Sequence, residues 1–446
     1  MQTNNVNFIG FNQDFQSILM GNFNGYMIYG IEMDEVVPKE SNKIIPIMKV
    51  GRLYNSSLVV FVSTDDPRKL TLFHHKRNAV IIEVKFSNSI LSVKLNRKVV
   101  VVCTEDGIYI YDTENMKRKH KVEIAPSNRH GIFALSTSDF SVLAYPSTNM
   151  TGNVHVFNIA EMKNVVIIEA HQGAIAALEF NQISDCLATA SDKGTVIRLF
   201  KIPSGDKFGE FRRGFARCAT ISCLSFSLDS QFLLVCSNTE TVHVFSMAQG
   251  DKDVCNRHSI SNFNIGTKDE MICSPINSDN SYGSYWINYV GSALKATSSF
   301  LPYPALQMTE IFSQDRCFSV ARLPNLDQST NHLKNSLRKV GAVIKYDNGW
   351  RIVVATFDGF IHIFKFDCDL GGEAELLKTY DLINEKYIIK SNPSSIQDNK
   401  SKDSLTKQSN FGLLRPKSFS SDEPSNLQFN NLDIADENEF PPIQKL

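Results

Sequence analysis

A short segment recurs seven times along this chain of 446 residues, and this repeat limits the possible folds more than any other feature. In each copy a turn residue, often Gly, leads into β-branched and apolar residues and then an aromatic ring. The copies occupy residues 25–29, 69–73, 107–111, 152–157, 194–200, 240–245 and 359–364. Their aromatic positions are separated by 44, 38, 46, 43, 45 and 119 residues. Such regularity predicts an array of similar structural units.

The spacing indicates which unit repeats. The first five gaps match the about 40–45 residues of a four-stranded propeller blade, and the last equals one blade plus about 75 inserted residues. Within the fifth unit, strand-like runs cover 174–180, 186–190, 195–201 and 207–212. Their composition favours short antiparallel strands over helices. We therefore predict an all-β, seven-bladed, WD40-like β-propeller over residues 1–390, although the Trp-Asp dipeptide of WD40 blades is absent.

Two stretches depart from the repeat. The sixth unit contains an insertion, about residues 247–315, that begins polar and becomes apolar at 282–312. Residues 391–446 are rich in Ser, Asn, Asp, Lys and Pro, which predicts a disordered tail. Whether strands from residues 1–12 complete the last blade stays open at this stage.

The net charge and the cysteine content of the chain limit which partners it can bind and which cellular compartment it can occupy. The chain has 46 Lys and Arg against 47 Asp and Glu, a formal net charge of -1. This balance argues against nucleic acid as a partner, because coating it needs a broad positive field. Nine Cys without a CxxC pair predict free, mostly buried thiols in a reducing compartment. With no recognisable signal peptide or spanning segment, we expect a cytosolic protein.

The tetrapeptide FRRG at 211–214 closes the last strand of the fifth unit. Successive side chains of an extended chain point to opposite sides, so Arg212 and Arg213 serve two different places. Each guanidinium is a planar fork of donors suited to phosphate. Three further basic residues lie next to the Arg pair, namely Lys193, Lys207 and Arg217. We therefore predict a local positive patch around Arg212 and Arg213. The plain alternative is a solvated Arg pair at a strand end.

This tetrapeptide occurs with EAHQG at 169–173, ATASDKGTVIR at 188–198 and TVHVF at 241–245. In this combination the chain resembles the PROPPIN family, the phosphoinositide-binding propellers of autophagy that include the WIPI proteins. The resemblance covers essentially all seven units. It implies a non-enzymatic protein without cofactor or metal, peripheral on phagophore assembly site, vacuole and endosome membranes. It also implies two rim pockets for phosphatidylinositol 3-phosphate or phosphatidylinositol 3,5-bisphosphate.

The resemblance assigns residues to both pockets. The first would contain Arg212 with His171, Ser191, Lys193 and Thr195; the second would contain Arg213 with Ser237, Thr239, Thr241 and His243. Hydroxyl groups can donate to phosphate or inositol oxygens without adding charge. For His243 a second interpretation stays open, because His155 and His362 occupy the same repeat position.

The apolar part of the insertion can be drawn as a helix with aromatic residues on one face. Gly283 and Gly291 weaken such a helix in water, whereas Trp and Tyr rings favour a bilayer interface. The resemblance implies a membrane-inserting loop, with the candidate residues Tyr285, Trp286, Tyr289, Val290, Leu294, Phe300 and Leu301. The alternative is a loop that folds back over its blade.

A second loop is a candidate partner surface. Pro67 and Arg68 lie just before the strand of the second unit, where Pro fixes the turn and Arg faces solvent. The pair resembles the Pro-Arg loop with which the family's yeast autophagy member binds a lipid-transfer protein. This resemblance favours the yeast-type member that acts in autophagy and vacuole regulation. As bare sequence, the segment is an ordinary loop.

Two other classes of protein compete with this interpretation. A WD40-like scaffold that binds only proteins accounts for the repeat but leaves the adjacent Arg pair unexplained. A propeller enzyme would need catalytic groups, yet the sequence contains no nucleophile elbow, HExxH, P-loop or dinucleotide fingerprint. We therefore expect a phosphoinositide effector rather than an enzyme.

Overall fold

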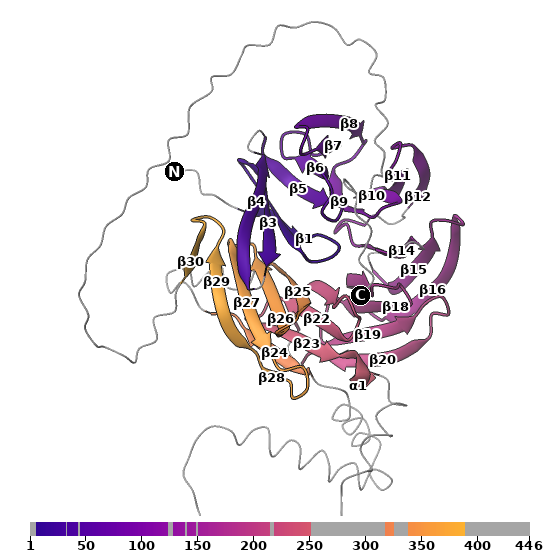
Figure 1. Ribbon diagram of the computed structural model, residues 1–446. Coiled ribbons are helices and arrows are strands. Elements are labelled where there is room, and N and C mark those ends of the chain that lie inside the picture. Colours follow the sequence, from indigo (N-terminus) through magenta and orange to yellow (C-terminus); the bar gives the residue numbers. More distant parts are fainter. Residues whose placement is uncertain are drawn as a thin grey trace, which may run out of the picture.

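The computed structural model describes residues 6–32, 34–42, 45–123, 128–138, 141–148, 150–214, 218–250, 317–324 and 338–388. Over these ranges the chain forms seven sheets set around a central axis (Figure 1). The predicted seven-bladed propeller is therefore confirmed. The membrane-loop candidates and the predicted tail lie outside the described residues.

The first four blades use the N-terminal part of the chain. The first contains β1 (Val6–Phe11), β2 (Ser17–Asn22), β3 (Gly25–Glu32) and β4 (Glu35–Asn42). The second contains β5 (Ile47–Arg52), β6 (Leu58–Ser63), β7 (Lys69–His74) and β8 (Ala79–Lys85). The third contains β9 (Ile90–Leu95), β10 (Val99–Thr104), β11 (Gly107–Asp112) and β12 (Arg118–Glu123). The fourth contains β13 (Ala134–Leu135), β14 (Val142–Pro146), β15 (Gly152–Asn158) and β16 (Lys163–His171).

The remaining blades carry the candidate site and the insertion. The fifth contains β17 (Ile175–Phe180), β18 (Cys186–Ser191), β19 (Val196–Lys201) and β20 (Lys207–Arg212), close to the four predicted runs. The sixth contains β21 (Ile221–Phe226), β22 (Phe232–Ser237), β23 (Thr241–Ser246), β24 (Ser319–Arg322) and β28 (Gly372–Glu373), with α1 (Met247–Gly250) after β23. The seventh contains β25 (Lys339–Tyr346), β26 (Gly349–Thr356), β27 (Phe360–Phe366), β29 (Glu375–Asp381) and β30 (Lys386–Ile388).

The repeat detected in the sequence is the third strand of each blade. The seven repeat aromatics lie on β3, β7, β11, β15, β19, β23 and β27. One of the longest apolar runs of the chain, at 99–103, lies in β10, a second strand that is buried along its whole length. Because each blade packs on a neighbour at both faces, its inner strands lose the apolar–polar alternation of a half-exposed sheet.

The core is distributed around the ring rather than gathered at one centre. Seven hydrophobic clusters are present, and each joins two neighbouring blades. The innermost strands contact one another in a closed circle, in the order β1, β5, β9, β13, β17, β21, β25 and back to β1. Each blade is therefore stabilised by burial against both neighbours.

The structure answers how the ring closes. β1 pairs with β2 in the first blade, and the seventh blade is built entirely from residues after 338. The first and seventh blades meet through a shared apolar cluster and through the Arg351 guanidinium, which binds both Asp34 carboxylate oxygens at 2.5 and 2.9 Å. In the part of the chain that the structure describes, closure therefore depends on side chains and not on a shared strand.

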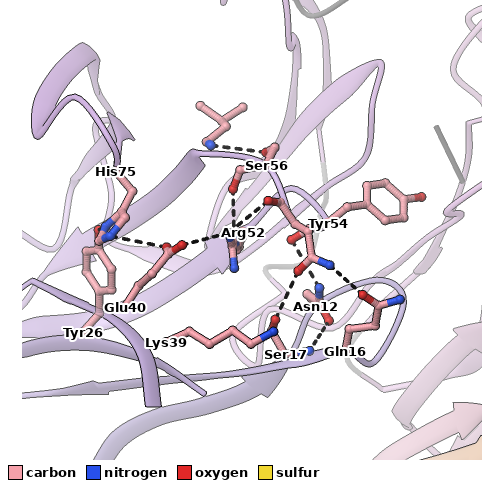
Figure 2. Close-up of polar contacts among 12 residues, drawn as sticks. Asn12, Gln16, Ser17, Tyr26, Lys39, Glu40, Arg52, Tyr54, Ser56 and His75 are labelled. Carbon is pink, nitrogen blue, oxygen red and sulfur yellow. Dashed lines mark hydrogen bonds and ion pairs between the residues drawn. The ribbon is translucent and has the colours of Figure 1, made fainter. Parts of the chain in front are cut away.

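Polar side chains also join the first and second blades (Figure 2). The buried Arg52 side chain donates to the Ser56 carbonyl at 2.8 Å and lies 3.3 Å from the Glu40 carboxylate. The other Glu40 oxygen lies 3.3 Å from His75, whose Nδ1 is 2.8 Å from the Tyr26 hydroxyl. This cluster fastens β4 of the first blade to β5 and the end of β7 in the second.

Candidate functional site

β20 is the outermost strand of the fifth blade, and its side chains alternate between two neighbouring blades. Phe211 stacks on Phe245 of the sixth blade, with ring centroids 4.8 Å apart. Glu210 instead lies 3.0 Å from Arg198, which donates to the Ala170 carbonyl of the fourth blade at 2.7 Å. By this alternation, Arg212 lies on the same face of the strand as Glu210, and Arg213 lies on the same face as Phe211. The two arginines therefore diverge from one extended segment.

The residues assigned to the first pocket lie where the fourth and fifth blades meet. His171 ends β16, and its Nε2 is 2.9 Å from the Thr189 hydroxyl on β18. Thr189 also donates to the Arg198 carbonyl at 3.3 Å. Ser191 is buried at the end of β18, whereas Lys193 is exposed in the following turn. Thr189 and Arg198 were not among the predicted site residues, because their ordinary positions within strands gave no signal.

Charge near the first pocket is partly compensated. The Glu210 carboxylate lies 3.0 Å from Arg198 and 2.9 Å from Lys207, one of the residues of the predicted positive patch. These two ion pairs hold the pKa of Glu210 below its usual value, against the effect of burial. Arg217, the third residue of that patch, lies outside the described residues.

The four accessory residues assigned to the second pocket form one continuous chain of polar contacts. The Ser237 hydroxyl is 2.9 Å from that of Thr239, which is 3.3 Å from that of Thr241. Thr241 in turn is 3.2 Å from Nε2 of His243. This series of polar contacts follows the turn between β22 and β23. The structure thus brings these four side chains together along one edge of the sixth blade.

Cationic groups surround His243. Burial is the main cause that lowers the pKa of His243 to about 4, followed by the positive charges of Arg213, Arg322 and Lys339. Its Nδ1 is buried without a hydrogen-bond partner among the described residues. Arg322 and Lys339 are further cations that sequence reasoning missed, since they follow the insertion in sequence. The effect of Arg213 on His243 agrees with its direction toward the sixth blade.

Two other blades also have a histidine at this repeat position, and the pKa of each is lowered as well. His155 stacks on Tyr145 at a centroid distance of 5.3 Å, and burial lowers its pKa. His362 is 3.0 Å from the Thr379 hydroxyl, and its pKa is lowered to about 4, mainly by burial. A His at this position therefore recurs in three blades, where His243 and His362 are buried and His155 is half-buried. The hydroxyl chain and the adjacent Arg213 distinguish His243.

The turn at 191–195 positions Arg213. The backbone N–H of Arg213 donates to the Thr195 carbonyl at 3.0 Å, and its Nε donates to the Gly194 carbonyl at 2.8 Å. Gly194 has φ of +58°, and a Cβ there would collide with the Ala219 carbonyl oxygen. The N–H of Ala219 donates to the Lys193 carbonyl at 3.1 Å. The glycine thus allows this turn to pack against the segment that enters the sixth blade.

The partner-loop candidates lie between β6 and β7, in the second blade. The Pro67 carbonyl accepts from the Ile90 N–H at 2.8 Å, and the Arg68 carbonyl accepts from the Phe86 N–H at 2.9 Å. Arg68 is exposed. The backbone of this loop is therefore fixed to the start of the third blade, while the Arg68 side chain faces solvent.

The described residues offer neither a metal centre nor a membrane-spanning helix. Among the described residues, no three His, Cys, Asp or Glu side chains gather closely enough to hold a metal ion. In the same part of the chain, helical structure nowhere reaches the length and apolar character required to cross a bilayer. The seven described cysteines are all free thiols; three of them are buried.

These features define a class of protein: a seven-bladed propeller with two consecutive arginines at the rim of its fifth blade, the second of which lies near His243 and its hydroxyl neighbours. Residues 5–268 match the PROPPIN family model. The chain belongs to the PROPPIN family, and it is a non-enzymatic propeller protein.

Individual relatives agree with this assignment. The chain is 34% identical to "Autophagy-related protein 18" of Caenorhabditis elegans over 87% of its own length and 89% of the relative. It is also 34% identical to "WD repeat domain phosphoinositide-interacting protein 1" of Homo sapiens, over 97% and 92%. Kluyveromyces lactis Hsv2 shares the fold, with a TM-score of 0.60 at 18% identity over 85% of this chain and 100% of that one.

Proposed function

We propose that this protein is a phosphoinositide effector of autophagy that binds phosphatidylinositol 3-phosphate and phosphatidylinositol 3,5-bisphosphate through two rim pockets. The observation that carries the proposal is the divergence of Arg212 and Arg213 from one strand end. Arg212 serves the pocket with His171, and Arg213 serves the pocket with His243. Guanidinium groups bind phosphate through two parallel donors, and the neighbouring hydroxyls accept or donate to inositol oxygens. Family membership and the names of the relatives support this function.

Two pockets on one rim provide avidity. When one headgroup is bound, the second binding event becomes intramolecular, so the combined affinity exceeds that of either pocket. The insertion of the sixth blade adds a membrane anchor through Trp286 and its aromatic neighbours, a proposal that depends on sequence alone. The protein then attaches peripherally to membranes that carry 3-phosphorylated lipids, including the phagophore assembly site, vacuole and endosome.

Liposome flotation tests the lipid proposal. Arg212→Thr with Arg213→Thr removes both guanidiniums and should abolish flotation with vesicles that contain either lipid. Each single variant should keep weakened binding, because one pocket stays intact. A matched control, Arg68→Thr with Arg118→Thr, removes the same charge from two exposed positions elsewhere and should float like the wild type. Unchanged flotation by the first double variant would refute the proposal and favour a scaffold that binds only proteins.

The partner proposal has a separate test. The loop with Pro67 and Arg68 recruits the lipid-transfer protein of autophagy, as in the yeast-type member that acts in autophagy and vacuole regulation. Replacing Pro67 and Arg68 by Ala should remove this protein from a pull-down while liposome binding persists. Retention of the lipid-transfer protein by the variant would contradict the assignment of this loop.

A further inference from the structure

The axial channel of the propeller opens into a cavity of about 820 Å³. Residues of β1, β5, β9, β17, β21 and β25, six of the innermost strands, contribute to its wall. A volume of this size lies within the range of about 300–1,000 Å³ that is typical of small-molecule sites. The cavity lies at the axis, whereas Arg212 and Arg213 lie on and beyond the outermost strand of a blade. Most of its wall therefore lies away from the rim pockets, although Lys339, one of the cations near His243, also lines it.

The cavity has an excess of positive charge although the whole chain is nearly neutral. Two acidic residues, Glu179 and Asp192, line it. Five basic residues line it, namely Lys49, Lys94, Arg129, Arg338 and Lys339. An enclosed wall of one predominant sign concentrates counter-ions, so the channel attracts small anions.

Three of these five cations already have partners. Lys94 lies 3.1 Å from the Glu179 carboxylate, and Arg129 lies 3.6 Å from Glu105. Lys339 donates to the backbone carbonyl of Thr239. These contacts leave Lys49 and Arg338 as the cations to be explained.

Lys49 and Arg338 have no ion pair with an acidic side chain among the described residues. The Lys49 ammonium lies 5.9 Å from the centroid of the Phe8 ring, on the channel wall. Burial lowers the pKa of Lys49, and the positive charge of Arg338 lowers it further. Both groups line the same cavity, so their like charges repel each other across it. An anion between them replaces this repulsion by two attractions.

We propose that the mouth of the axial channel binds a small soluble anion that carries two or more phosphate groups, held between Lys49 and Arg338. The Arg338 guanidinium suits bidentate phosphate binding, and the Lys49 ammonium supplies a compact charge deeper in the channel. Asn7, Asn128 and Asn238 also line the cavity. Their amides bond to the backbone, since those of Asn7 and Asn128 donate to the Ile47 and Ile132 carbonyls and that of Asn238 accepts from the Thr220 N–H. A ligand with several phosphates matches the two unpaired cations better than a singly charged anion.

Isothermal titration calorimetry of the full chain tests this site, with inositol hexakisphosphate and inorganic pyrophosphate as probes. Lys49→Met with Arg338→Met should weaken binding by at least about tenfold, since each lost charge-assisted contact is worth roughly that factor. The control Lys76→Met with Arg118→Met removes two exposed cations and should bind like the wild type. Arg338→Met alone, at an exposed position, provides a variant whose folding is not at risk.

Three outcomes would overturn the proposal. The wild type could fail to bind either probe at about 1 mM, which is the weak limit of specific affinity. The channel variant could bind as tightly as the wild type. Arg212→Thr with Arg213→Thr could abolish probe binding, which would assign the anion to the rim. Flotation distinguishes a lipid source, because the channel variant should still bind vesicles with 3-phosphorylated lipids; its failure to do so would assign the channel to a lipid headgroup.

Discussion

Arg212 and Arg213 are consecutive residues, yet their side chains belong to different blade interfaces. The alternation of an extended strand produces this separation, and the Phe211 stack on Phe245 fixes its direction. At the scale of single residues, the neighbours of each arginine then decide its chemistry. Arg213 lies near buried His243, whose pKa is lowered to about 4, so a phosphate bound there would meet the positive charges of Arg213, Arg322 and Lys339 together with hydroxyl donors.

Buried histidines predict how stability depends on pH. His171, His243 and His362 have their pKa values lowered to about 4, with burial as the largest cause. In the unfolded chain a histidine titrates near about 6.5, so the unfolded state binds more protons between these values. The stabilisation is therefore complete above about pH 6.5 and declines as the pH falls toward about 4. Chemical denaturation at several pH values should show this loss.

A variant can identify the histidine responsible. His362 is 3% exposed, so His362→Gln should reduce the pH dependence by on the order of 2 kcal/mol between about pH 6.5 and 4. His130→Gln changes an exposed residue and is the matched control. If the free energy of unfolding depends on pH equally in the wild type and in His362→Gln, the role given to this side chain is contradicted.

At the scale of elements, the turn between β18 and β19 connects the two pockets. It carries Ser191, Lys193 and Thr195 of the first pocket, while its carbonyls hold Arg213 of the second. We expect Gly194→Ala to destabilise the fold by about 2 kcal/mol or more, because φ is positive and the new methyl would meet Ala219. It should also weaken vesicle binding, since Arg213 loses its backbone acceptor geometry.

Gly214→Ala is the control for this prediction. Gly214 lies in the same FRRG motif, but a Cβ there would meet no atom within 4 Å. The Gly214→Ala variant should match the wild type in its unfolding midpoint and in its flotation with vesicles. If both glycine variants lose stability equally, the turn at 191–195 does not have the special role argued for Gly194.

The sequence predicts some elements better than others, for physical reasons. The third strands repeat their aromatic ring, and five of the seven segments begin with a glycine, because each faces the same kind of environment. All seven were therefore found at their observed places. β28 was not predicted, because two residues that pair in parallel with β24 leave no periodic pattern. At the site, FRRG directed attention to Arg212 and Arg213. Arg198 and Arg322 were missed because tertiary packing alone brings them near His171 and His243.

At the scale of the whole molecule, the ring distributes stability over seven interfaces that differ in their polar contacts. The closing interface joins residues more than 300 positions apart, such as Asp34 and Arg351. Among the described residues, no strand is shared between the first and seventh blades, unlike in a propeller closed by exchange of its terminal strand. Side chains must therefore hold the first blade against the seventh. The hydroxyl of Tyr387 adds a bond, accepting from the Val36 N–H at 2.6 Å.

This arrangement predicts that Arg351→Met weakens closure. Arg351 is 4% exposed, and its removal leaves the Asp34 carboxylate without its bidentate partner, so the free energy of unfolding should fall by about 3 kcal/mol. Lys378→Met is the matched control, because Lys378 pairs with Glu35 across the same interface but is 39% exposed, and such exposed pairs contribute less than about 1 kcal/mol. Urea unfolding measures both losses, and hydrogen exchange locates them. Faster exchange in β3, β4 and β26 than in β10 would show that the ring opens at its closing interface, whereas uniform acceleration in all blades would show that closure contributes no separate step.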